Sequence, residues 1–160
     1  SFLWRPDVLC GRAEAAPPEA ARVRAQAVLD ADAFREEGNT NYRAARYAEA
    51  VEAYTLSLEL DPSQHLCLSN RSAAHLKLDA AGSARLDALQ CVKLAPTWPQ
   101  GYARLAAASL VLKRWDDVEA ACGACAEVAD DTLDPDGDLA NELLRMLEEA
   151  ERGRTSRSPS

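Results

Sequence analysis

An internal repeat constrains the fold of this chain more than any other feature. A shift of 34 residues aligns three blocks that begin near Ala31, His65 and Pro99. Small residues stand at the eighth position of each block, which holds Gly38, Ser72 and Ala106, and at the twentieth, which holds Ala50, Ala84 and Val118. A larger residue stands at the fourth position, which holds Phe34, Leu68 and Tyr102. Small side chains let two helices approach closely. Pro62 and Pro96 end the first two blocks and would stop a helix there. Each block therefore predicts one pair of helices.

This pattern resembles the tetratricopeptide repeat in its period and in the size of the residue at each position. The resemblance covers residues 31–130 and implies an all-α fold, a right-handed superhelix of three tetratricopeptide helix pairs. A fourth amphipathic segment, Asp138 to Arg152, puts Leu139, Leu143, Leu144 and Leu147 on one helical face. It is predicted to be the C-terminal capping helix that covers the open end of the array.

The expected domain is a repeat domain over residues 19–152, with repeats near 31–64, 65–98 and 99–132 and the capping helix near 138–152. Pro18 is expected to begin a helix whose face carries Val23, Ala27, Val28, Ala31 and Phe34. Residues 1–18 are expected to be poorly ordered and residues 153–160 to form a disordered tail, because neither segment has a helical period. The chain begins with Ser1 rather than Met, which favours a fragment of a longer protein.

Composition narrows the possible partners. Of the 160 residues, 48% are hydrophobic and 28% charged, which favours a folded protein, and the net charge is −8. Such a chain is a poor candidate for binding nucleic acid or an anionic membrane, because both require a clustered basic surface. No stretch is apolar enough to cross a membrane. The 5 cysteines are sparse for a disulfide scaffold, which favours a reducing compartment and a cytoplasmic protein.

The charges of the first helix in each repeat are informative, because these helices line the concave face of such an array. Residues 65–78 contain Arg71 and Lys77 and no acidic residue, and residues 99–112 contain Arg104 and no acidic residue. The acidic residues of these two repeats fall in the second helices. The groove is therefore expected to be locally positive.

Polar residues in the groove form a pattern suited to a carboxylate. Arg35 and Asn39 are four apart on one helical face, and Gln100 and Arg104 repeat this spacing. Asn70 and Arg104 stand at the sixth position of successive repeats, so stacking should bring them together. Guanidinium and amide groups would make a donor-rich cradle for a chain's C-terminal carboxylate, and a final Asp would offer a second carboxylate. At the thirteenth positions, Arg43 and Lys77 would contact acidic side chains further upstream.

The strings FREEGNTNY, Arg46–Tyr47, LSNRSAAHLKL and GYARLAAASL resemble the co-chaperone tetratricopeptide domains that grip the C-terminal Glu-Glu-Val-Asp of the seventy- and ninety-kilodalton heat-shock chaperones. The resemblance implies that Arg35, Asn39 and Asn70 hold the terminal carboxylate. It also implies that Arg104 reaches the acidic side chain or the upstream backbone. The family usually has Lys where Arg35 and Gln100 stand. Gln100 carries no charge, so binding should be weaker or the preferred C-terminus different.

Two alternatives remain. The domain would be a scaffold for an internal peptide that needs no free carboxylate, or an enzyme using Cys122 and Cys125 as a redox pair or metal site. We favour core packing for these cysteines, because their repeat positions normally bury small side chains. Trp98 and Trp115 are expected in the core, and His75 is expected to be partly buried. We predict a non-enzymatic adaptor without a cofactor or metal.

Overall fold

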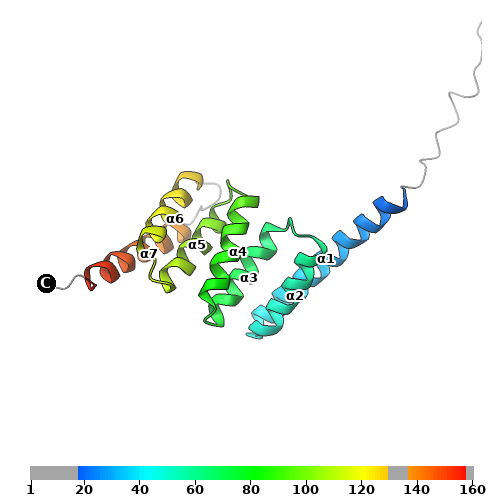
Figure 1. The fold of residues 1–160 in the computed structure, drawn as a ribbon, viewed down its shortest axis with the longest axis horizontal. Coiled ribbons are helices and arrows are strands. Elements are labelled where there is room, and N and C mark those ends of the chain that lie inside the picture. Colours follow the sequence, from blue (N-terminus) through cyan, green and yellow to red (C-terminus); the bar gives the residue numbers. More distant parts are fainter. Residues whose placement is uncertain (1–17, 130–136, 158–160) are drawn as a thin grey trace, which may run out of the picture.

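The computed structural model describes residues 18–129 and 137–157 and contains helices and turns only within these ranges. The seven helices are α1 Glu19–Arg43, α2 Tyr47–Leu60, α3 His65–Lys77, α4 Ala81–Leu94, α5 Pro99–Val111, α6 Trp115–Val128 and α7 Asp138–Thr155. Successive helices stand side by side along an elongated array, with α1 at one end and α7 at the other (Figure 1).

Contacts between helices follow the repeat. Helix α1 packs against α2, α3 against α4, and α5 against α6. Neighbouring pairs are joined by contacts of α2 with α3 and of α4 with α5, and the first helices also touch one another. Helix α7 contacts α5 and α6, so it lies where the first helix of a fourth repeat would stand. The predicted array of three helix pairs with a C-terminal capping helix is confirmed.

The same turn joins the two helices in every repeat. Ala45, Asp79 and Lys113 have φ of 59°, 57° and 56°, in the left-handed region that non-glycine residues seldom adopt. The next N–H donates to a carbonyl five residues earlier, which is the Schellman arrangement that ends a helix. These bonds are Arg46 to Asn41, Ala80 to His75 and Arg114 to Ser109, each 2.9 Å. The repeat period therefore extends to backbone conformation.

The small residue at the eighth position has a steric reason in the first repeat. A Cβ added to Gly38 would lie 3.0 Å from Cζ of Tyr54 and closer still to Cε1 and Cδ1 of that ring. The Tyr54 side chain is 1% exposed and packs in the core between α2, α3 and α4. Glycine at position 38 thus lets the tyrosine ring lie directly against the backbone of α1.

A hydrogen bond recurs at the twenty-seventh position of the repeat. Ser57 Oγ, Cys91 Sγ and Cys125 Sγ each donate to the carbonyl of the first residue of their own repeat, over 2.7, 3.3 and 3.2 Å. The acceptors are Ala31, His65 and Pro99. The bond ties the last turn of each second helix to the first helix, at its first residue in α3 and α5 and at its middle in α1. Cys125 therefore has a structural role.

Several helix details differ from the sequence predictions. Pro18 is the residue before α1 and not its first residue. Val23 and Val28 are 60% and 47% exposed, because the first half of α1 extends beyond α2 (Figure 1). In α7 the buried face holds Leu139, Leu143, Met146 and Ala150, whereas Leu144 is 57% exposed. The prediction for Leu144 is wrong, since the buried side chains follow a spacing of three and four that excludes it.

Helix α7 also continues to Thr155, past the predicted end at residue 152. Gly153 lies against Trp115, where an added Cβ would be 2.6 Å from Cη2 of the indole. Arg154 pairs with Asp116 at 2.8 Å and with Glu119 at 2.9 Å on α6. These contacts give the last turn of α7 a packing partner. The predictions for residues 1–17 and 158–160 lie outside the described residues.

Candidate functional site

A cavity of about 120 Å³ opens among α1, α2, α3 and α5. It is lined by Asn39, Tyr42, Arg43, Tyr54, Asn70, Ala73 and Arg104. Four of the predicted binding residues, from three repeats, therefore share one cavity: Asn39, Arg43, Asn70 and Arg104. Cavities for drug-sized molecules hold about 300–1,000 Å³. This one is suited to a smaller group, such as the end of a peptide chain.

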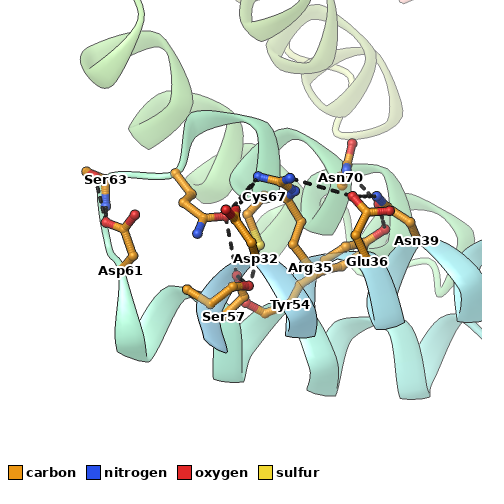
Figure 2. Close-up of polar contacts among 12 residues, drawn as sticks. Asp32, Arg35, Glu36, Asn39, Tyr54, Ser57, Asp61, Ser63, Cys67 and Asn70 are labelled. Carbon is orange, nitrogen blue, oxygen red and sulfur yellow. Dashed lines mark hydrogen bonds and ion pairs between the residues drawn. The ribbon is translucent and has the colours of Figure 1, made fainter. Parts of the chain in front are cut away.

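Two amide side chains of the cavity lining, Asn39 and Asn70, lie against each other (Figure 2). Asn39 Oδ1 accepts hydrogen bonds from Asn70 Nδ2 and from the Tyr54 hydroxyl, each 2.8 Å long. Asn39 Nδ2 donates to Glu36 Oε1 over 3.2 Å. Each amide nitrogen has two N–H groups, so each keeps one for a ligand. The pair therefore presents donors and is suited to an anion.

Two guanidinium groups also line the cavity. Arg104 is half-buried on α5, and its Nε is buried without a hydrogen-bond partner in the described residues. Arg43 is exposed on α1 and donates to Thr40 Oγ1 over 3.5 Å. Within the described ranges, neither arginine forms an ion pair. Both charges are therefore uncompensated at the cavity, which favours a negatively charged ligand.

Arg35 does not line this cavity. Its guanidinium pairs with Asp32 at 2.9 Å and Glu36 at 3.5 Å (Figure 2). It also donates to Gln64 Oε1 over 3.4 Å. The sequence contains the signal for the first of these contacts, because charges three apart on a helix pair readily. A ligand carboxylate would compete with Asp32 and Glu36 for the charge of Arg35.

Gln100 and Lys77 are exposed and also lie outside the cavity lining. Gln100 is the second residue of α5, one helical turn before Arg104. Lys77 is the last residue of α3, one turn beyond Ala73 of the cavity wall. Both residues are adjacent to the cavity along their helices, and their roles in binding stay predictions.

Arg71 does not add the positive charge to the groove that the sequence suggested. Its Nε and Nη2 donate to the two carboxylate oxygens of Asp87 on α4, over 2.8 and 2.6 Å. It also donates to Thr55 on α2 over 3.1 Å. The hydrogen bond with Asp87 raises the pKa of Arg71. The prediction is wrong because helix packing places a buried carboxylate within reach of this guanidinium.

His75 lies beside this ion pair, with Nε2 3.7 Å from Asp87 Oδ2. Burial lowers the pKa of His75 more than the nearby Asp87 raises it. The imidazole is therefore neutral near pH 7. It is partly buried, as predicted, and it lies outside the cavity.

The two cysteines of the CxxC motif belong to the core around α5, α6 and α7. Cys122 is 2% exposed and Cys125 is fully buried, and burial raises the pKa of Cys122. A reactive thiol requires the opposite shift and access to solvent. Trp115 packs against the same core, and Trp98 packs against the core around α2, α3 and α4. In the part of the chain that is described, no group of three His, Cys, Asp or Glu side chains could hold a metal ion.

The sequence reasoning did not identify the two tyrosines of the cavity. Tyr54 occupies the twenty-fourth repeat position, where the later repeats have Ala88 and Cys122. The sequence did contain a signal for Tyr54, because it places a large polar ring in a repeat that has glycine at its eighth position, whereas the later repeats have smaller residues in place of the ring. Tyr42, in the last turn of α1, forms an edge contact with Tyr47, the first residue of α2, at a centroid distance of 5.3 Å.

The comparisons with known proteins agree with this architecture. No protein-family model matches the chain. Over 92 residues, 57% of this chain, it is 39% identical to the heat shock protein STI1 of Saccharomyces cerevisiae. That alignment covers 16% of STI1, so the chain spans a small part of the relatives it matches.

No described helix is long and apolar enough to cross a membrane.

Two solved structures have the same fold. The TPR2B domain of yeast Sti1, solved as a pHsp70 complex, gives a TM-score of 0.71 at 25% identity, covering 78% of this chain and 98% of that one. The first TPR of Spaghetti (RPAP3), bound to the HSP90 peptide SRMEEVD, also gives 0.71, at 22% identity, covering 80% and 95%. The described residues thus have the fold of a tetratricopeptide repeat domain, similar to the TPR2B domain of yeast Sti1 and the first TPR of RPAP3.

Proposed function

We propose that this domain binds the acidic C-terminal peptide of a heat-shock chaperone of the seventy- or ninety-kilodalton class. The observation that carries the proposal is the cavity, which joins Asn39, Asn70 and Arg104 from three successive repeats. The two amides present N–H groups, and the guanidinium has no carboxylate partner in the described residues. The first TPR of RPAP3 is bound to the HSP90 peptide SRMEEVD, and the TPR2B domain of Sti1 is in a pHsp70 complex, which supports the same ligand class here.

Different cavity residues would bind different groups of the ligand. The terminal carboxylate accepts the remaining N–H groups of Asn39 and Asn70. Arg104 contributes charge-assisted hydrogen bonds to a carboxylate, which are about twice as strong as neutral ones. Arg43 and, further along α3, Lys77 attract acidic side chains upstream of the terminus. Arg35 would contribute less than Arg104, because Asp32 and Glu36 already compensate its charge.

The second candidate is a scaffold that binds an internal peptide. Two observations favour it: Gln100 has no charge, and the charge of Arg35 is already compensated by Asp32 and Glu36. A site with fewer available cations depends less on a free carboxylate. Contacts along the groove would then supply most of the affinity.

Calorimetry with a peptide ending in Glu-Glu-Val-Asp separates the two candidates when the same peptide is also tested as its C-terminal amide. We expect the free acid to bind at least tenfold more tightly, because the amide loses its charge-assisted bonds. Arg104→Ala and Asn39→Ala should each weaken binding about tenfold or more. Arg114→Ala is the matched control, because Arg114 is exposed at the start of α6 and pairs with Asp117. Equal binding of acid and amide, or no binding of either, would refute the proposal.

The proposed role is that of an adaptor in the cytoplasm, without catalytic chemistry or a cofactor. The competing enzyme hypothesis requires reactive Cys122 or Cys125. In a Cys10→Ser variant, the remaining thiols, Cys67, Cys91, Cys122 and Cys125, are all buried. They should react with a thiol reagent only on the timescale of unfolding. Rapid labelling of the native protein would favour the enzyme hypothesis.

A further inference from the structure

We propose that Tyr54 is a positioning residue for the peptide carboxylate, acting by fixing the orientation of the Asn39 side-chain amide. This inference rests on the proposed function and adds a residue from the second helix of the repeat to its site. Tyr54 lines the cavity, yet its side chain is only 1% exposed. A ligand therefore meets Asn39 and Asn70, while Tyr54 acts on the ligand through Asn39.

The geometry shows how the hydroxyl acts. An asparagine amide can turn over and exchange its oxygen with its nitrogen, so a carboxylate site must hold it in one orientation. The Tyr54 hydroxyl and Asn70 Nδ2 both donate to Asn39 Oδ1, each over 2.8 Å. These two donors occupy the oxygen and leave the nitrogen available. Without the Tyr54 hydroxyl, Asn39 Oδ1 keeps only one of these two donors. The flipped orientation of the Asn39 amide, which turns its oxygen toward the ligand carboxylate, then becomes more populated.

The hydroxyl stays protonated, and is therefore able to donate, across the neutral and mildly alkaline pH range. Burial is the main reason that the pKa of Tyr54 is raised to about 12. The ring is also held in place, because Gly38 leaves no room between it and the backbone of α1. A rigid donor orients its acceptor more precisely than a mobile one. Position 24 of the second and third repeats has Ala88 and Cys122, so the first repeat alone supplies a phenol here.

The test uses Tyr54→Phe in the complete chain, since this change removes the hydroxyl and keeps the ring. We expect the free-acid peptide to bind about three- to tenfold more weakly, which corresponds to one hydrogen bond. Binding of the amidated peptide should stay within twofold, because the orientation of Asn39 matters most for the carboxylate. Tyr102→Phe is the matched control: its hydroxyl donates to the Pro96 carbonyl over 2.8 Å, outside the cavity.

A second measurement distinguishes positioning from general destabilisation. If Tyr54 acts through Asn39, then Tyr54→Phe should have less than a twofold effect on peptide binding in an Asn39→Ala background. An equal loss in both backgrounds, or an equal loss for acid and amide, would overturn the inference. So would unchanged binding by Tyr54→Phe when the unmodified protein prefers the free acid. If the unmodified protein binds neither peptide, the proposed function itself fails, and the two failures are therefore distinct.

Discussion

Replacing Gly38 with alanine should destabilise the domain, although alanine is the better helix former. The new Cβ would lie 3.0 Å from Cζ of Tyr54 and nearer to Cε1 and Cδ1, whereas carbon atoms are ordinarily about 3.5–4.0 Å apart. The ring or helix α1 must therefore shift. Overpacking of a core costs about 1–3 kcal/mol, and the nearly complete burial of Tyr54 places this case near the upper end.

The helix propensity of alanine opposes this cost. Exchanging glycine for alanine inside a helix contributes about 1 kcal/mol of stability. Subtracting this gain from a packing cost of about 3 kcal/mol leaves a net loss of about 2 kcal/mol. Gly123 is the matched control, since it lies inside α6, is exposed, and would have nothing within 4 Å of an added Cβ. Gly123→Ala should therefore stabilise the domain by about 1 kcal/mol.

Urea denaturation followed by circular dichroism measures both free energies of unfolding. The expected result is a separation of about 3 kcal/mol between the two variants, with opposite signs relative to the parent protein. Tyr54→Leu should recover part of the loss in the Gly38→Ala background, because it removes the ring that the new methyl group meets. Equal stability of Gly38→Ala and Gly123→Ala would refute the steric reasoning. A Gly38→Ala variant more stable than the parent would refute it as well.

Three further predictions concern charge. Asp87→Ala should lower the free energy of unfolding by about 2–4 kcal/mol in denaturant melts, because it leaves the largely buried Arg71 unpaired. Peptide affinity should change little. Loss of peptide binding without loss of stability would contradict this prediction and place Arg71 in the binding site. Because the pKa of His75 is lowered in the folded protein, the unfolded chain binds more protons than the folded protein as the pH falls below about 6.5, and the free energy of unfolding should decrease there. His75→Gln should make this decrease smaller between about pH 6.5 and 5. Gln100→Lys should strengthen binding of a Glu-Glu-Val-Asp peptide in calorimetry, more so at low salt, because it adds a cation one turn from Arg104; unchanged affinity would mean that Gln100 stands too far from the ligand.

Much of the candidate site followed from helical geometry. Asn39, Asn70 and Arg104 stand at repeat positions that face the same side of the first helices, and the structure brings all three into one cavity. Position within a repeat determines the direction of a side chain, because each helix pair stacks on the next in the same way. Tyr54 was not predicted, because it lies on a second helix, whereas the groove was expected to be lined by the first helices.

The 34-residue period by itself determined the helix pairs and their order, because small and large residues recur at fixed positions of each block, and the amphipathic pattern of residues 138–152 determined the capping helix. Only the tertiary structure decided which cations are free to meet a ligand. Arg71 on α3 pairs with Asp87 on α4, sixteen residues away, whereas Arg104 has no carboxylate partner in the described residues. The physical reason is the length of the arginine side chain, which can contact carboxylates on several neighbouring helices. Helix packing determines which of those carboxylates lie close enough to form an ion pair.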